Sequence, residues 1–129
     1  QAVVRDGGMV PVWEMTKAVW VTENFVATEN AEYCRIRDVF VKTPIPGYLG
    51  GTSAVADLAY RDKLHSIQSP TRIIAAGDDP VTPIEKSKEI QSQISNSELI
   101  VIEGQRHFSN VEVPETFNNE LVRCLDQII

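Results

Sequence analysis

The chain has little of what several specialised classes of protein require. Its 129 residues include only two cysteines and two histidines, and the formal net charge is −6, so there is no excess of positive charge. Acidic and basic residues are scattered, which leaves no electrostatic footprint for nucleic acid, and we predict no nucleic-acid partner. No apolar run is long enough to span a bilayer, so no membrane partner is predicted. With 43% hydrophobic residues, we expect a soluble globular protein with a real core.

Cysteine usage points to a reducing compartment. Cys34 and Cys124 are far apart in the sequence and fit no metal-ligand spacing. We therefore expect two ordinary thiols, no disulfide, no metal site and a cytoplasmic location. The chain begins at Gln1 without an initiator Met, which is compatible with a processed or truncated product.

The first half of the chain predicts helices. Between Met9 and His65 there is no sustained strand alternation, and breaks are expected at Glu29-Asn30, at Thr43–Gly47 and at Gly50-Gly51. One helix is predicted to bury the face formed by Tyr33, Ile36, Val39 and Phe40, and another helix is predicted over Thr52–Leu64. We assign residues 1–66 to a helical region.

From Pro70 onward, strand and helix patterns alternate, so residues 67–129 predict an α/β element. Strands are expected over Arg72–Ala76 and Leu99–Ile102. Between them, Thr82-Pro83-Ile84-Glu85 has the pattern of a capping box and predicts a helix from Pro83 to about Ile94. A last helix is expected from about Pro114, with an apolar face of Phe117, Leu121, Cys124, Leu125 and Ile128 packed on the sheet.

Two chemically useful side chains follow the two predicted strands. Asp79 comes after the first strand and His107 after the second. Parallel strands joined by a helical crossover end at the same sheet edge, so we predict that Asp79 and His107 are neighbours. An acid beside a histidine is two thirds of a hydrolytic triad, although a loop aspartate alone is most often a turn former. Asp78 is the weaker candidate for the acid, and His65 is assigned no role.

A nucleophile is harder to find. Gly51-Thr52-Ser53-Ala54-Val55 imitates the start of a G-x-S-x-G elbow, but Val55 replaces the second glycine and no strand precedes the run. Ser53 is better interpreted as a residue near a helix start. Ser109 follows His107 too closely to face it from another strand, and neither cysteine has the electropositive, loop-tip setting of a reactive thiol. The chain as given lacks a credible nucleophile.

Five stretches carry a family resemblance. Residues 70–83, which contain Ala76-Gly77-Asp78-Asp79-Pro80, and residues 104–118, which contain Gly104-Gln105-Arg106-His107, resemble the carboxyl-terminal half of an α/β-hydrolase. Gly8-Met9, Trp20-Val21-Thr22 and Pro46-Gly47-Tyr48 resemble the helical cap of the 3-oxoadipate enol-lactonases of aromatic catabolism, in the β-ketoadipate pathway. The resemblance implies an α/β fold in which a helical cap, or lid, precedes the last two parallel strands and their flanking helices.

The resemblance also implies roles for single residues. Asp79 would be the acid of the catalytic triad, His107 its histidine, and Trp20 a cap residue that lines the lactone pocket. Hydrolysis of a lactone or ester would need no metal or organic cofactor. The substrate carboxylate could attract a cation, but Arg35, Arg37 and Lys42 are better interpreted as solvated helix-surface residues. The family's first half, which holds the nucleophilic serine, is absent here, so this fragment alone is predicted to be inactive and that half is the expected partner.

Two alternatives stay open. Another ester hydrolase or a cofactor-free haloperoxidase-like enzyme would share the Asp79 and His107 motifs. A module without catalytic activity could also keep this architecture. An unpaired sheet edge would then favour a homodimer, because an exposed edge offers a template for another strand.

Overall fold

The computed structural model describes residues 2–126, except for the side chains of Ala2 and Arg5. The chain forms two compact units. Unit 1 comprises residues 1–18 and 22–59, and unit 2 comprises residues 19–21 and 60–129. The units therefore divide after Ala59, and the short segment 19–21 belongs with the second unit. The boundary after residue 66 stays a prediction.

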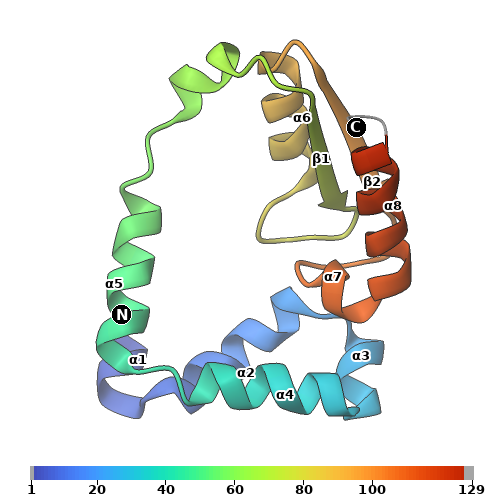
Figure 1. Ribbon diagram of the computed structural model, residues 1–129. Coiled ribbons are helices and arrows are strands. Elements are labelled where there is room, and N and C mark those ends of the chain that lie inside the picture. Colours follow the sequence, from blue (N-terminus) through green and yellow to red (C-terminus); the bar gives the residue numbers. More distant parts are fainter. Residues whose placement is uncertain (1, 127–129) are drawn as a thin grey trace. The chain divides into compact units, whose positions relative to one another are not determined.

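Unit 1 is helical, in agreement with the sequence pattern (Figure 1). Its elements are α1 (Ala2–Gly7), α2 (Met9–Trp20), α3 (Glu23–Thr28), α4 (Ala31–Val41) and α5 (Ile45–Ala56). The last residues of α2 extend into segment 19–21.

Local chemistry explains the break at Glu29-Asn30, which the sequence predicted. Glu29 ends α3 in the left-handed region with φ 43°, and Asn30 caps α4 by accepting a hydrogen bond from the Tyr33 amide at 2.9 Å. In the same way, the Thr22 hydroxyl accepts from the Phe25 amide at 3.2 Å and begins α3. Short polar side chains satisfy amides that a helix start leaves without partners.

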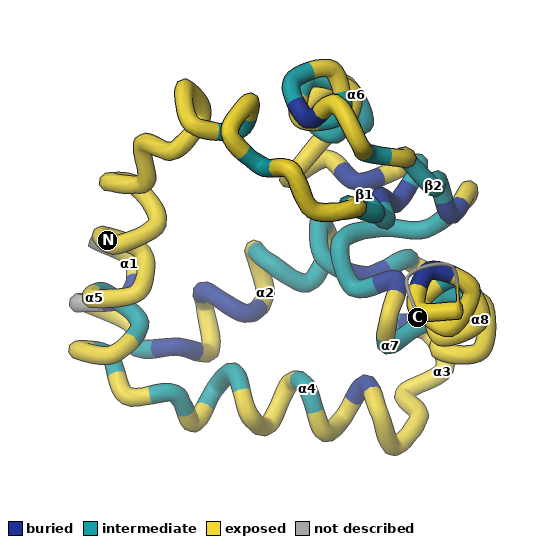
Figure 2. Tube along the Cα trace, turned by 45° about the horizontal axis from the view of Figure 1, so that its top comes forward, coloured by how far each residue is buried: buried dark blue, intermediate teal, exposed yellow. Residues whose placement is uncertain are grey.

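Aromatic contacts form the core of unit 1. Trp13 is 1% exposed, and its ring centroid lies 5.9 Å from that of Tyr33 and 5.5 Å from that of Phe40. A second cluster contains Val4, Met9 and Val12, with Phe40, Ile45, Tyr48 and Leu49 packed against it. Figure 2 shows these buried stretches along α2 and the exposed outer turns of α4 and α5. The predicted burial of Val39 is wrong, because this side chain is 62% exposed.

Two helix boundaries in this region differ from the prediction. Helix α5 continues through Gly50-Gly51 and ends at Ala56, so neither a break at these glycines nor a helix over Thr52–Leu64 is observed. Each glycine costs a helix only about 1 kcal/mol relative to alanine, which packing of Tyr48 and Leu49 can offset. Residues 57–60 are not helical, and a short 3₁₀ helix, η1 (Arg61–Ser66), follows.

Unit 2 is a strand-helix-strand unit, as the sequence predicted. Strands β1 (Thr71–Ala76) and β2 (Ser97–Ile102) are parallel, with Ile73 opposite Leu99 and Ala76 opposite Ile102. Helix α6 (Ile84–Gln93) connects them, and α7 (Ser109–Glu112) and α8 (Pro114–Asp126) follow β2. Helices α6 and α8 lie on opposite sides of the two strands (Figures 1 and 2). The expected strand direction is confirmed, because β1 and β2 are parallel.

Two details of unit 2 differ from the prediction. The predicted capping box does not form, because the residue that caps α6 is Pro83 and no side chain bonds to the helix start. On α8, Cys124 is buried but Leu121 and Leu125 are 42% and 49% exposed, so the predicted face is only partly covered. Ile128 lies outside the described residues.

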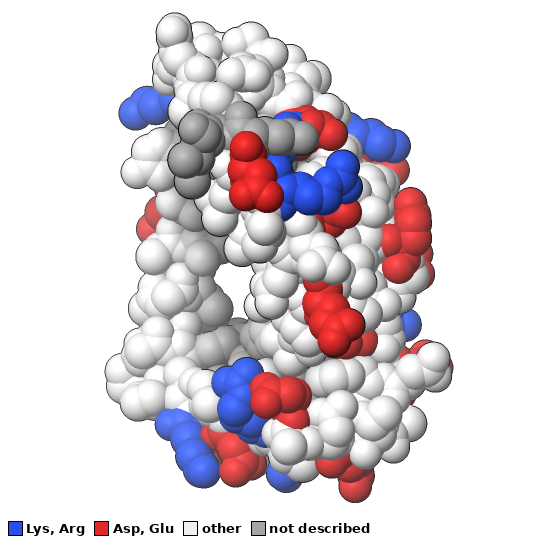
Figure 3. Space-filling model, turned by 45° about the vertical axis from the view of Figure 1, so that its right-hand side comes forward, with Lys and Arg blue, Asp and Glu red and all other residues white. Residues whose placement is uncertain are grey.

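Charged side chains of both signs lie on the face drawn in Figure 3, and neither sign covers a large area there. Several are paired within one helix, such as Lys17 with Glu14 at 2.6 Å. Among the helices of residues 2–126, none combines the length and the apolar character needed to cross a membrane.

Candidate active site

The candidate site is built where the two strands end. The Gly77 amide donates to the Ile102 carbonyl at 2.9 Å, and the Asp78 amide donates to the Gln105 carbonyl at 3.0 Å. These bonds hold the loop after β1 against the loop after β2. A Cβ on Gly77 would lie 2.5 Å from a Glu103 carboxylate oxygen and 3.3 Å from the Glu103 Cα, so a larger residue here would displace the Glu103 side chain and crowd its backbone. Gly104 allows the second loop to turn, with φ +70°.

This arrangement brings Asp79 and His107 together, as the sequence predicted. Asp79 Oδ2 lies 2.8 Å from His107 Nδ1, although the two residues are 28 positions apart. The Asp79 side chain is 5% exposed, whereas that of His107 is 32% exposed. A buried acid therefore contacts one nitrogen of an imidazole that still reaches the surface.

Three further hydrogen bonds hold the Asp79 carboxylate. Its Oδ1 accepts from the amides of Val81 at 2.7 Å and Thr82 at 3.2 Å, and its Oδ2 also accepts from the Thr82 hydroxyl at 2.5 Å. Burial by itself raises the pKa of Asp79, but the hydrogen bonds from Thr82, His107 and Val81 outweigh it and hold the pKa below its usual value. At neutral pH, Asp79 is thus an anion that can only accept.

The charge of Asp79 fixes the state of His107. Because the carboxylate has no proton to donate, the 2.8 Å contact requires a proton on His107 Nδ1. In the neutral ring, Nε2 is then the atom with a free lone pair. This is the tautomer that a general base needs.

The lowered pKa of Asp79 predicts a pH-dependent effect of Thr82. An acid whose folded pKa is depressed stabilises the fold above its unfolded pKa, near 3.9, and this stabilisation is lost as pH falls through the folded pKa. We expect Thr82→Val to lower the free energy of unfolding by about 1 kcal/mol at pH 7, because Asp79 loses a hydroxyl donor. The loss should shrink at pH 3.

Urea unfolding at both pH values measures this difference. Thr82→Ser, which keeps the hydroxyl, is the matched control and should behave like the parent protein. An equal loss of stability at pH 3 and pH 7 in Thr82→Val would show that the hydroxyl does not act through the charge of Asp79.

Trp20 lies beside the imidazole. Its ring centroid is 6.3 Å from that of His107 with an interplanar angle of 29°, and 4.7 Å from that of Phe108. Trp20 is the last residue of α2 and is half-buried in segment 19–21 of unit 2. The structure therefore places this predicted site residue against the histidine.

The structure also gives the local setting of the other residues considered from the sequence. The prediction that Ser53 lies near a helix start is wrong, because Ser53 is exposed in the last turn of α5. Ser109 is buried at the start of α7. Arg35 and Lys42 pair with acidic neighbours on the surface of α4. Cys34 and Cys124 are both free thiols.

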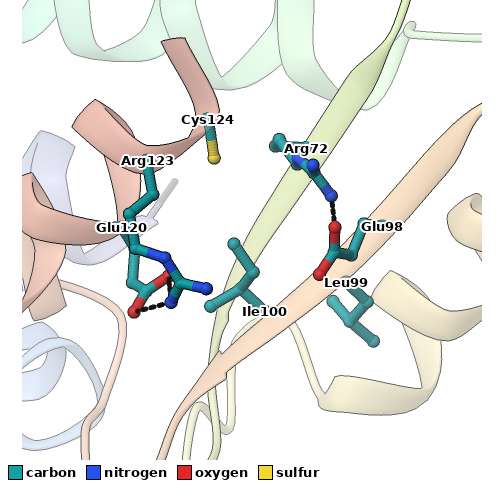
Figure 4. A pocket seen from close by; sticks show the side chains of 7 residues that line it. All are labelled: Arg72, Glu98, Leu99, Ile100, Glu120, Arg123 and Cys124. Carbon is teal, nitrogen blue, oxygen red and sulfur yellow. Dashed lines mark hydrogen bonds and ion pairs between the residues drawn. The ribbon is translucent and has the colours of Figure 1, made fainter. Parts of the chain in front are cut away.

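Two surface pockets are separate from the Asp79–His107 pair. One, of about 240 Å³, lies between the strands and α8, where Arg72 pairs with Glu98 and Arg123 with Glu120 (Figure 4). It is lined by Arg72, Glu98, Leu99, Ile100, Glu120, Arg123 and Cys124. The other, of about 230 Å³, lies between η1 and α6. Within residues 2–126, no group of three acidic, histidine or cysteine side chains could hold a metal ion.

Sequence reasoning missed how the site is supported. Thr82 was interpreted as a helix cap, but its hydroxyl and amide both donate to Asp79. The spacing of three residues from Asp79 to Thr82 is the local signal that could have indicated this turn. For Arg106, whose guanidinium donates to the Val21 carbonyl at 3.2 Å, no sequence signal was available because 85 positions separate the two residues.

Known proteins with similar sequences are hydrolases. The chain is 34% identical over 115 residues to 3-oxoadipate enol-lactonase 1 of Acinetobacter baylyi. The matched region covers 88% of this chain and 42% of that protein. It is 29% identical over 117 residues to 3-oxoadipate enol-lactonase 2 of the same organism. This match covers 91% of this chain and 43% of that protein. The chain therefore spans less than half the length of these relatives. No family model matches it.

The fold has a close counterpart among solved structures. The crystal structure of the enol-lactonase from Burkholderia xenovorans LB400 matches with a TM-score of 0.91 at 24% identity, over 97% of this chain and 48% of that one. The chain thus has the fold of the carboxyl-terminal part of an α/β-hydrolase, and its homologues include 3-oxoadipate enol-lactonases.

Proposed function

We propose that this chain supplies the acid and the histidine of a hydrolase of carboxylic esters or lactones, with 3-oxoadipate enol-lactone as the substrate. The observation that carries the proposal is the 2.8 Å contact between Asp79 Oδ2 and His107 Nδ1. The similarity to enol-lactonases supports the choice of substrate. In this proposal, a segment outside the chain provides a serine nucleophile.

The geometry of the pair suits acyl transfer. His107 Nε2 would take the proton of the serine hydroxyl as the oxygen attacks the lactone carbonyl, and Asp79 would stabilise the imidazolium that forms. His107 would then return the proton to the enol oxygen that leaves the carbonyl. Water, activated by His107 in the same way, would hydrolyse the acyl-enzyme and release 3-oxoadipate.

Trp20 would form one wall of the substrate pocket, beside the His107 imidazole. Its indole stacks near His107 and is half-buried, so one part of the ring remains available for contact with a ligand. We propose that it lines the lactone pocket. The two free thiols also support a cytoplasmic location for the enzyme.

A chimera tests the proposed activity. The amino-terminal portion of the Acinetobacter baylyi enol-lactonase 1 that precedes the matched region would be fused before Gln1, and hydrolysis of 3-oxoadipate enol-lactone and of nitrophenyl esters would be measured. We expect activity from the chimera and none from the isolated chain, because the serine is supplied only by the fused part.

The control is the same chimera with His107→Ala, which should lose activity roughly 10²- to 10⁴-fold, the range for a general acid-base residue. A folded chimera without hydrolysis would contradict the proposal, and so would equal activity of the isolated chain. A preference for simple esters over the lactone would favour the wider esterase class.

A second candidate function is an assembly module without catalysis. The described sheet has only two strands, so each strand has one edge without a partner strand in residues 2–126. Such an edge can pair with a second copy of the chain. A concentration-independent monomer in sedimentation velocity would contradict this candidate.

A further inference from the structure

Segment 19–21 is bonded to the histidine loop on both sides of His107. The Phe108 amide donates to the Trp20 carbonyl at 2.9 Å. Arg106 Nη1 donates to the Val21 carbonyl at 3.2 Å. Val21 itself is fully buried, with 0% exposure. The two residues that flank His107 in sequence are therefore both anchored to the same short segment.

The end of a helix explains why this segment attracts donors. Helix α2 ends at Trp20, and the last carbonyls of a helix have no amide partners within it. The carboxyl end of a helix also carries partial negative charge, which favours a cation. The loop after β2 meets both needs, since Phe108 offers an amide and Arg106 offers a guanidinium.

The side chains around the imidazole complete this arrangement. Trp20 and Phe108 both lie beside it, with centroid distances of 6.3 Å and 5.9 Å to His107, interplanar angles of 29° and 25°, and 4.7 Å between their own centroids. Asp79 holds Nδ1 at the ring edge. The position of His107 therefore depends on Asp79 and on how the loop sits against segment 19–21.

We propose that Arg106 is a positioning residue, which keeps the His107 imidazole aligned with Asp79 by anchoring the loop to the Val21 carbonyl. The consequence for hydrolysis depends on the proposed function, but the alignment itself does not. Arg106 acts through the backbone, whereas a residue that only stabilised the fold would leave the Asp79–His107 hydrogen bond unchanged in the folded state.

The test uses nuclear magnetic resonance on the 129-residue chain. The probe is the solvent exchange rate of the His107 Nδ1 proton, which the bond to Asp79 protects. We expect exchange to be about tenfold faster in Arg106→Met, which keeps the apolar stem but loses every donor. Arg106→Lys keeps one donor and should restore most of the protection. Arg123→Met, which removes an exposed arginine of α8, should leave the rate unchanged.

Two results would overturn the proposal. One is unchanged exchange at His107 in folded Arg106→Met, and the other is equal loss of protection in folded Arg106→Lys. If Arg106→Met does not fold, the test uses the parent chain. The Arg106 Nη protons should then exchange with solvent more slowly than the Arg123 Nη protons. Equal exchange rates would contradict the proposed hydrogen bond from Arg106 to the Val21 carbonyl.

The chimera adds a catalytic readout. Arg106→Met should lower kcat about tenfold with KM nearly unchanged, because substrate contacts are kept while the base is misaligned. An inactive parent chimera would contradict the proposed function alone, since the proton exchange of His107 is measured without substrate.

Discussion

Replacing Asp79 by asparagine is expected to lower kcat of the chimera roughly 10³- to 10⁴-fold with little change in KM, the size of effect seen when a triad acid is lost. The structure gives the reason. Two backbone amides, of Val81 and Thr82, point at Oδ1, so the asparagine oxygen must take that position. The NH₂ group of the asparagine then occupies the position of Asp79 Oδ2 and faces His107 Nδ1.

This exchange reverses the tautomer of the histidine. With a donor opposite Nδ1, the ring accepts there and carries its proton on Nε2, where it can no longer take a proton from a serine. Steady-state kinetics of lactone hydrolysis measure the loss. Asp78→Asn is the matched control, because Asp78 is exposed and its contact to the site is a backbone amide. Equal losses in both variants, or none in Asp79→Asn, would contradict the assigned role.

Replacing Trp13 by alanine is expected to lower the free energy of unfolding of unit 1 by about 3–5 kcal/mol, the usual cost of removing a buried aromatic side chain. Trp13 is 1% exposed and contacts the rings of Tyr33 and Phe40. Removal of the indole would leave a cavity between α2 and α4, where Trp13 contacts Tyr33 and Phe40. Urea unfolding followed by far-ultraviolet circular dichroism measures the change.

Two controls separate packing from other causes. Met15 lies on the same helix and is 66% exposed, so Met15→Ala should change stability by less than about 0.5 kcal/mol. The indole nitrogen of Trp13 has no hydrogen-bond partner within the described residues, so Trp13→Phe should cost clearly less than Trp13→Ala. A Trp13→Phe variant as unstable as Trp13→Ala would show that ring packing is not the dominant contribution.

Local pattern was sufficient for the main spatial prediction. A short apolar strand run, a turn, a helical stretch and a second apolar strand run define a crossover unit, and chain geometry then places both strand ends at one edge. The contact between Asp79 and His107 follows from that alone. The helix break at Glu29-Asn30 was equally predictable, because Asn30 caps the next helix through its own side chain.

Other features depend on residues that are distant in sequence. Helix α5 runs through Gly50-Gly51 because neighbouring residues pack on α1 and α2, an interaction that local propensity cannot report. Thr82 donates to Asp79 instead of capping α6, since a buried carboxylate needs donors more than an exposed helix start does.

The sequence by itself determined β1, β2, α6 and α8, and that an acid and a histidine share one sheet edge, because apolar strand runs, turns and crossover direction are set by nearby residues. Only the tertiary structure decided how that pair is held. The donors around Asp79 and the bond from Arg106 to Val21 depend on burial and on the meeting of distant segments, and burial is what makes an unmet hydrogen bond costly.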